Sequence, residues 1–370
     1  MSSGPLLTIA IPTFERDQSL KKCLDFLLPT LISAGKKVEL LLLDNASSDN
    51  TPSVIASFLG QIPKGLSATS FRHERNVGMS ENILACVERS SGLYFMFIGD
   101  DDTVNAEGIT QVLELLESGA SPSAILQGSW PTYGVNHQQT NSVEPKKALD
   151  YFFFAGNASA AISRTSFMKE AIIDFRKDRR LRNNIWPQTF LIFHSIFSHP
   201  DSAPLITSFP HGAMINEQWI VRPDKTYTIR IVEDLVDVAL GISRSLRTVP
   251  PPREFLTGQT KKFIELELQL VVSRSLRDMD RAGVISLVSK LGRSGIRVPF
   301  ALQIRVLFTR IPEFLLALTV VHLFATGGVR SVRRFIEELD VKRSLYRAEV
   351  LSAPQTGLRV RDFHSAKPPS

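Results

Sequence analysis

Hydrophobic residues recur with two different periods along the first part of the chain. Apolar runs lie at 6–11, 38–43 and 93–98, interrupted only by Thr8 and Glu39. Between and after them, apolar residues return every three or four positions, around 17–33, 51–60, 80–90 and 107–118. Short continuous runs are typical of strands buried on both faces, and the longer pattern predicts amphipathic helices. With a further short strand at Phe71, the alternation predicts an α/β fold in which helices cover both faces of a mostly parallel sheet.

The pattern becomes mixed after about residue 130. It indicates a strand or a lining segment within 151–163, a helix that Pro187 opens, and a late strand within 211–222. Long amphipathic patterns follow Pro223 and indicate helices. We therefore expect a first domain at 1–228, a mainly helical region at 229–360 and a loose tail at 361–370.

Three polar clusters follow three of the predicted strands, at 12–16, 44–51 and 99–102. Because ligands of parallel sheets bind beyond the carboxyl ends of the strands, we expect these clusters to converge on one crevice. The sequence has no G-x-G-x-x-G after a strand and no Walker A sequence. Their absence argues against a dinucleotide-binding or P-loop enzyme.

The third cluster contains three consecutive aspartates, Asp100, Asp101 and Asp102. Two carboxylates about 4 Å apart repel by about 4 kcal/mol at an effective dielectric constant near 20, so positive charge is expected beside them. Two interpretations stay open from these residues alone: a strand end in which Asp102 or Thr103 caps the next helix, and a metal site. An EF-hand loop is excluded, because Val104 stands where that motif needs an oxygen ligand.

The other clusters carry weaker signals. Asp44 ends a buried strand, where an acceptor-only carboxylate can accept the N–H of a pyrimidine. Residues 47–51 are better interpreted as the cap of the following helix. Gly78 permits a tight turn, and Asn82 lies on the first turn of the helix that follows.

The order and spacing of these motifs resemble the N-terminal half of the family 2 glycosyltransferases, which have the GT-A fold. The motifs are Pro12-Thr13, Asp44-Asn45, Asn76-x-Gly78 with Asn82, and Gly99-Asp100-Asp101-Asp102. Within that family the chain looks like the bacterial branch that includes abequosyltransferase-type enzymes of surface polysaccharide synthesis. The resemblance covers residues 6 to about 118 well and extends more loosely to about 222.

The resemblance implies a donor site made of Pro12, Thr13, Glu15, Asp44, Asn45, Asn76, Gly78 and Asn82. In it Pro12, Thr13 and Glu15 form the nucleotide-sugar turn, and Asp44 contacts the base, usually uracil. Glu15 departs from the family, which more often has Asn there. Its carboxylate would face a pyrophosphate unless it contacts the ribose or the base.

The same resemblance assigns Asp100 and Asp102 to a pair that holds Mn²⁺ or Mg²⁺ on the donor diphosphate. Such an ion relieves the carboxylate repulsion and stabilises the leaving diphosphate. Asp101, between them, would reach a sugar hydroxyl or support the ligands.

The acceptor side departs more strongly from the family. Inverting members usually carry a Glu-Asp pair ahead of a later helix, and its Asp acts as general base. Here that place reads RRLRNNIWPQTFL, and the nearby Asp174 and Asp178 are interpreted as surface ion pairs. His194 is interpreted as a packed core histidine. The base and the stereochemical outcome stay open.

Trp186, Pro187 and Gln188 form an alternative acceptor-side signature. Gln188 can hydrogen-bond an acceptor but cannot act as a base. We therefore list Gln188 with Asp101 as the candidate catalytic residues.

Composition restricts the class and the compartment. The 370 residues are 43% hydrophobic and 22% charged, which excludes global disorder. The net charge is +6, and its basic excess lies after residue 228, so we expect an anionic partner or surface. Cys23 and Cys86 lie in apolar helical patterns, which favours buried thiols in a reducing compartment. No signal peptide is evident, so we expect a cytoplasmic protein.

The uncharged run from Leu315 to Thr326 is too short to span a bilayer. Arg310 precedes it, and Arg330, Arg333 and Arg334 follow it. Two interpretations stay open: a helix buried against the first domain, and an interfacial helix on anionic lipid. The second would place the protein peripherally on the inner face of the cell membrane.

The sequence therefore predicts a glycosyltransferase that moves a sugar from a nucleotide-diphosphate donor, with a pyrimidine base, to a saccharide or lipid-linked acceptor in bacterial surface polysaccharide synthesis. A catalytically inactive sugar-nucleotide-binding scaffold is the alternative. Nucleic acid is not an expected partner, because no known binding fold or interleaved aromatic platform accompanies the basic tail.

Overall fold

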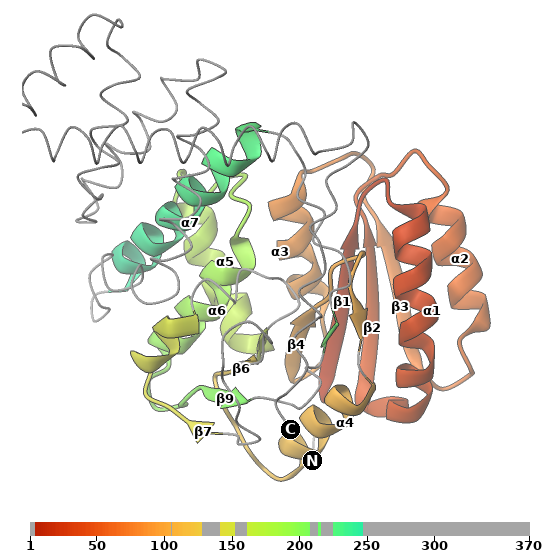
Figure 1. The fold of residues 1–370 in the computed structure, drawn as a ribbon, viewed down its shortest axis with the longest axis horizontal. Coiled ribbons are helices and arrows are strands. Elements are labelled where there is room, and N and C mark those ends of the chain that lie inside the picture. Colours follow the sequence, from red (N-terminus) through yellow and green to blue (C-terminus); the bar gives the residue numbers. More distant parts are fainter. Residues whose placement is uncertain are drawn as a thin grey trace, which may run out of the picture. The chain divides into compact units, whose positions relative to one another are not determined.

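The computed structural model describes residues 4–104, 106–127, 141–151, 161–207, 214–215 and 225–246 (Figure 1). The chain separates into two compact units, Met1–Gln303 and Ile304–Ser370, and every described residue belongs to the first. Most of the predicted helical region at 229–360, the run from Leu315 to Thr326 and the predicted tail at 361–370 therefore lie outside the described residues.

A sheet of eight strands forms the centre of the described part. Its strands are β1 (Leu7–Thr13), β2 (Val38–Asp44), β3 (Ser67–Arg72), β4 (Tyr94–Phe97), β6 (Ala124–Gln127), β7 (Asn141–Ser142), β8 (Ala161–Arg164) and β9 (Leu205–Thr207). They are ordered β3-β2-β1-β4-β8-β6-β9-β7. Strands β3, β2, β1 and β4 run parallel, whereas β8 is antiparallel to β4 and β6. The predicted mostly parallel α/β sheet is confirmed.

Two short strands lie apart from this sheet. β5 (Thr103–Val104) pairs antiparallel with β10 (Met214–Ile215). β5 therefore follows the aspartates directly, and the chain turns into the next helix only after it.

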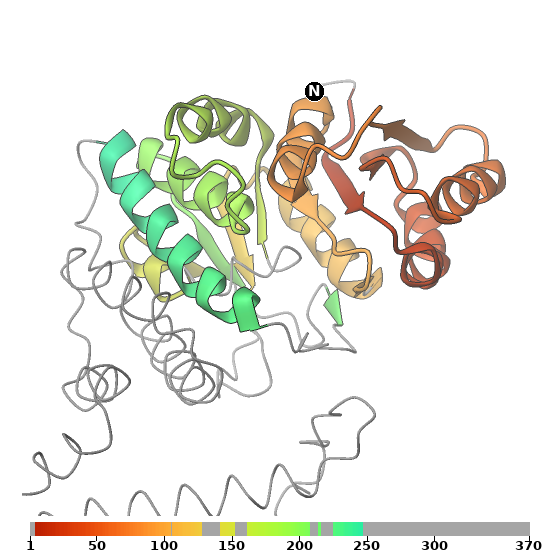
Figure 2. The same ribbon diagram turned by 90° about the horizontal axis from the view of Figure 1, so that it is seen from above.

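The helices are α1 (Asp17–Ala34), α2 (Thr51–Gln61), α3 (Met79–Arg89), α4 (Ala106–Glu117), α5 (Thr165–Lys177), α6 (Pro187–Ser198) and α7 (Lys225–Ser245), with short 3₁₀ turns at Gly35–Lys37 and Lys147–Tyr151. The apolar stripes of α1, α2 and α4 share one core with alternate residues of β1, β2 and β4. α3 lies on the other side of β1 and β2 (Figure 1). Figure 2 shows α7 alongside α5 and α6.

The predicted cysteine environments agree with the structure. Cys23 of α1 and Cys86 of α3 are buried free thiols, and burial raises the pKa of both. Searching the helices of the described part, we find none that combines the length and the apolar character needed to traverse a bilayer.

Strand register brings the three polar clusters together. In the parallel pairing of β1 with β2, Thr13 lies opposite Asp44. In the pairing of β1 with β4, Ala10 lies opposite Phe97, and Ile98 continues the ladder by donating its N–H to the Ala10 carbonyl at 2.9 Å. The chain after β4 thus reaches the level of Thr13 at the first aspartate. The expected convergence at the carboxyl ends of β1, β2 and β4 is observed.

Candidate active site

Asp100 lies where the carboxyl ends of these strands meet, which is the place predicted for the crevice. The Thr13 hydroxyl donates to its Oδ2 at 2.8 Å, and the Arg16 guanidinium lies 3.2 Å from its Oδ1. The same guanidinium contacts Asp101 Oδ2 at 2.6 Å. Burial raises the pKa of Asp100 to about 6; Asp101 and Asp102 add to the rise, while Arg16 and Thr13 oppose it. The cluster therefore holds more negative charge than Arg16 balances.

Gly99 allows the carboxylates to approach the backbone closely. A Cβ atom at this position would lie 2.9 Å from Asp102 Oδ2 and 3.1 Å from Asp101 Oδ1. Real Cβ atoms essentially never approach as closely as 2.9 Å, so a side chain here would displace at least one aspartate. Both carboxylates thus occupy the same side of the Gly99 turn.

The helix-cap interpretation of the triplet is wrong for this structure. α4 begins at Ala106, and β5 (Thr103–Val104) separates it from Asp102. The Asp102 side chain is nevertheless buried, with the residue only 3% exposed. The burial of Asp102 is therefore not explained by its being the first residue of α4.

Metal binding is one explanation of this burial, and the oxygen donors present fit a hard cation. Mg²⁺-type ions take one or two carboxylates and complete their coordination with water and substrate oxygens. Asp100 and Asp102 offer two buried carboxylates in one turn of chain. Among the described residues, no group of three or more His, Cys, Asp or Glu side chains is arranged to hold an ion without such additional oxygens.

Asp44 occupies the end of β2 and is 2% exposed. Its Oδ1 accepts the Ser47 N–H at 2.9 Å, and its Oδ2 lies 3.4 Å from the Arg72 guanidinium. Within the described part of the chain, this buried Oδ2 accepts no hydrogen bond. A carboxylate oxygen of this kind favours a ligand that brings a donor.

Asn45 and Asn76 connect the loops that follow β2 and β3. Asn45 Nδ2 donates to Asn76 Oδ1 at 2.9 Å, and its Oδ1 accepts the Val77 N–H at 2.9 Å. The Gly78 N–H donates to Asn76 Oδ1 at 2.8 Å, and Gly78 has a φ of 87°, a left-handed value that favours glycine. The Asn45 N–H also donates to the Thr13 carbonyl at 3.0 Å. Hydrogen bonds therefore link the end of β1 to the loops after β2 and β3, and these form the floor of the crevice.

Asn82 faces this floor from the first turn of α3. Its Nδ2 donates to the Leu43 carbonyl at 3.3 Å, and its Oδ1 lies 3.1 Å from His73 Nε2. Asn82 is buried, so in this structure it joins α3 to the end of β2.

Glu15 has a strained backbone and a turned side chain. Its φ of 52° and the φ of 63° at Ala46 are left-handed values, which cost energy in residues other than glycine and concentrate at functional sites. The Ser48 hydroxyl donates to Glu15 Oε1 at 2.8 Å, and the Glu15 N–H donates to Ser47 Oγ at 2.8 Å. The carboxylate thus lies against the loop after β2.

The predicted capping by residues 47–51 is carried by Asp49. Its Oδ1 accepts the Thr51 N–H at 3.0 Å at the start of α2. Its Oδ2 accepts the Asp17 N–H at 3.1 Å at the start of α1. One carboxylate therefore serves two helix starts beside the crevice.

On the acceptor side, α6 opens with Pro187, as predicted, and Gln188 on its first turn is buried. Asp174 pairs with Lys177 at 2.9 Å, and Arg244 Nε donates to Asp178 Oδ2 at 3.0 Å. The two acids therefore form ion pairs, as predicted.

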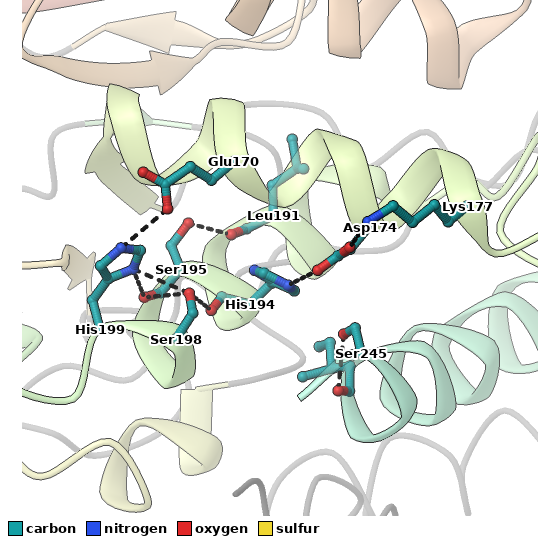
Figure 3. Close-up of polar contacts among 10 residues, drawn as sticks. Glu170, Asp174, Lys177, Leu191, His194, Ser195, Ser198, His199 and Ser245 are labelled. Atoms are coloured by element: carbon teal, nitrogen blue, oxygen red, sulfur yellow. Dashed lines mark hydrogen bonds and ion pairs between the residues drawn. The ribbon is translucent and has the colours of Figure 1, made fainter. Parts of the chain in front are cut away.

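His194 is a buried histidine on α6, as predicted. Its Nε2 lies 3.0 Å from Asp174 Oδ2 (Figure 3). Burial lowers the pKa of His194, and Asp174 opposes this change. Figure 3 also shows His199 with Ser198 and Glu170. His199 follows the last turn of α6, about 18 Å along the helix axis from Pro187, and is therefore at the opposite end of α6 from Gln188.

Sequence reasoning missed the two arginines that face the aspartates. Arg16 contacts the triplet, and Arg72 pairs with Asp44. Arg16 could have been predicted, because three neighbouring carboxylates require positive charge and Arg16 is the only basic residue of the cluster at 12–16.

Residues 8–184 match the family model described as Glycosyl transferase family 2. This span includes the carboxyl ends of β1, β2 and β4 and the donor-side residues described above, but not Pro187 or Gln188. The matched span therefore resembles a family 2 glycosyltransferase domain. The match does not separate the abequosyltransferase-type branch from the rest of the family, so that finer resemblance stays a prediction.

Two solved structures support the GT-A fold of this domain. TarS from S. aureus has a TM-score of 0.57 and 13% identity, covering 82% of this chain and 52% of its own. The mannosyltransferase PcManGT from Pyrobaculum calidifontis, in complex with GDP-Man and Mn²⁺, has a TM-score of 0.50 and 15% identity, covering 89% of this chain and 83% of its own. The chain thus spans about half the length of TarS. No curated protein matches the chain.

Proposed function

We propose that the protein is a metal-dependent glycosyltransferase that moves a sugar from a nucleotide-diphosphate donor to a saccharide or lipid-linked acceptor. The observation that carries this proposal is the carboxylate cluster at the carboxyl end of β4, where burial raises the pKa of Asp100 to about 6 although Arg16 is in contact. Such a cluster requires more positive charge, and it adjoins Asp44 and Asn45 at the end of β2.

In this proposal Asp100 and Asp102 hold the Mn²⁺ or Mg²⁺ that binds with the donor. The ion would supply Lewis-acid stabilisation of the leaving diphosphate. Asp101 orients the aspartates through Arg16 or contacts a sugar hydroxyl. The Arg16 guanidinium, held at 3.2 Å from Asp100 and 2.6 Å from Asp101, is within reach of any anionic group that enters beside them.

Asp44 is proposed to accept a hydrogen bond from the nucleotide base. Its buried Oδ2 accepts no hydrogen bond from the described residues, and the Arg72 guanidinium, 3.4 Å away, orients the carboxylate. A pyrimidine N–H matches this acceptor. PcManGT is in complex with GDP-Man, so the identity of the base is a point that the binding test below decides.

The remaining predicted contacts belong to the same proposal. Pro12, Thr13 and Glu15 border the donor from β1, and Asn76, Gly78 and Asn82 border it from the loop before α3. Gln188 and Trp186 face the acceptor side from the start of α6. Asp174 and Asp178, the two acids considered for this side from the sequence, are both held in ion pairs, so we assign no base.

Contact with the inner face of the cell membrane is proposed for the basic segment around Arg330, Arg333 and Arg334. Binding to vesicles with anionic lipid should exceed binding to neutral vesicles. Reversing these three charges should remove the difference, at about 1 kcal/mol per residue. Equal binding to both vesicle types would favour a buried helix instead.

A thermal-shift panel of nucleotide sugars, each with and without Mn²⁺, tests the proposal. We expect a pyrimidine nucleotide sugar to raise the melting temperature selectively, and only with the metal. Turnover of the stabilising donor then distinguishes an enzyme from an inactive scaffold. Absence of any nucleotide effect would contradict the proposal.

A further inference from the structure

The segment between α5 and α6 displays three arginines in four residues. Arg179, Arg180 and Arg182 are all exposed. Their side chains form no ion pair or hydrogen bond within the part of the chain that the structure describes. The segment therefore presents three guanidinium groups to solvent.

These charges are not neutralised by their neighbours. The acidic side chains of α3 and of the end of α5 that face this region have basic partners: Asp174 with Lys177, Asp178 with Arg244, and both Glu81 and Glu88 with Arg176. The charges of these carboxylates are therefore already balanced when an anion reaches the segment.

The backbone of the segment is fixed by hydrogen bonds. Asn184 is 1% exposed, its Nδ2 donates to the Asp234 carbonyl at 2.8 Å, and its Oδ1 accepts the Trp186 N–H at 2.7 Å. The Ser80 hydroxyl donates to the Asn184 carbonyl, and the Ile185 N–H donates to Asp234 Oδ2 at 2.9 Å. The arginines thus project from a loop held between α3 and α7.

The same loop borders the donor crevice. Asn183, with a left-handed φ of 61°, places its Oδ1 3.7 Å from the position of a Cβ on Gly78. Gly78 donates to Asn76, which accepts from Asn45 on the crevice floor. The arginine segment is therefore on the rim of the proposed donor site, next to the start of α6.

We propose that Arg179, Arg180 and Arg182 bind a phosphate group carried by the acceptor substrate, in a phosphate ester or diphosphate close to the hydroxyl that receives the sugar. This proposal rests on the proposed function. Guanidinium groups offer paired N–H donors that match phosphate oxygens. Three of them within four residues of sequence match the charge of one phosphate or diphosphate, and do not make the extended track that a nucleic acid strand needs.

The experiment measures phosphate binding by calorimetry on the full chain, with uridine diphosphate and Mg²⁺ added first to occupy the donor crevice. The probes are inorganic phosphate, glucose 1-phosphate, and phosphatidylcholine vesicles with and without phosphatidic acid. Wild type is compared with the triple variant R179Q/R180Q/R182Q. The matched control is K22Q/K36Q/K64Q, which removes the same charge from exposed positions of the described chain outside the crevice.

We expect the triple variant to bind at least one phosphate probe about tenfold or more weakly than wild type, with the control within about twofold. Loss confined to phosphatidic acid vesicles identifies a lipid phosphate, and loss with glucose 1-phosphate identifies a soluble ester. The proposal is overturned if wild type binds no probe, or if the triple variant and the control behave alike.

Uridine diphosphate binding, measured in the same samples, separates the two proposals. Unchanged affinity in the triple variant, together with lost phosphate binding, supports both. If wild type binds no nucleotide at all, the proposed function fails, while the comparison of the phosphate probes still decides the role of the arginines.

Discussion

Replacing Asp100 with asparagine should stabilise the metal-free protein at neutral and higher pH. Burial raises the pKa of Asp100 from 3.8 to about 6, so the folded chain holds this proton more tightly than the unfolded chain does. The ionised form of Asp100 is therefore less costly in the unfolded chain than in the folded chain, and the free energy of unfolding falls as pH rises from 3.8 through 6. Asparagine has nearly the same shape and does not ionise.

The size of the effect follows from the shift. About two pKa units correspond to about 3 kcal/mol between the two protonation states. The Asp100 side chain is 10% exposed, so solvent screens little of this energy. At about pH 4.5 part of the free-energy cost of ionising Asp100 in the folded chain is already present. The stabilisation by Asp100→Asn should therefore grow by about 2 kcal/mol, and not by the full amount of about 3 kcal/mol, between about pH 4.5 and about pH 8.

Urea unfolding in EDTA at the two pH values measures this growth directly. The control is Asp25→Asn on the outer surface of α1, where the side chain is 57% exposed and pairs only with Lys21 at 2.7 Å among the described residues. Its effect should be nearly the same at both pH values. If Asp100→Asn likewise has the same effect at both pH values, burial does not raise the pKa of this carboxyl and the prediction is wrong.

Three further predictions concern the same crevice. Asp102→Asn should fold normally yet transfer sugar about 100-fold more slowly or worse, and EDTA should reproduce the loss in wild type; full turnover in either case would remove the metal site. Asp44→Ala should weaken nucleotide binding by about 1.5 to 3 kcal/mol in calorimetry, and unchanged affinity would refute its contact with the base. Gly99→Ala should destabilise the fold by about 1 to 3 kcal/mol and reduce turnover, because its Cβ would lie 2.9 Å from Asp102 Oδ2; wild-type melting and activity would contradict the close approach.

The elements of the sheet were predictable because their signals are local. The run at 93–98 is apolar throughout and the run at 38–43 is apolar apart from Glu39, and the structure has β4 and β2 there. The helix that Pro187 opens was also predictable, since proline fits the first turn. Short strands such as β7 and β9 carry too few residues for either period to be recognised.

The partners of the crevice residues were less predictable. The pairing of Arg72 with Asp44 depends on the register between β2 and β3, which places those two residues opposite each other. The role of Asn184 depends on Ser80, which lies 104 positions away in sequence. Such contacts arise from tertiary packing and leave no local pattern.

The shared register of β1, β2 and β4 also determines where the chain tolerates change. Thr13, Asp44 and Asp100 lie at the same level because the number of residues in each strand and the register between the strands place them there. Inserting one residue within β1 would turn Thr13 to the other face of the sheet and shift it along the strand, although no crevice residue had been altered. Insertions in the connection at 62–66, before β3 begins, leave the positions of these residues along β1, β2 and β4 unchanged. We therefore expect functional diversification of this scaffold to proceed by loop exchange, with strand lengths held constant.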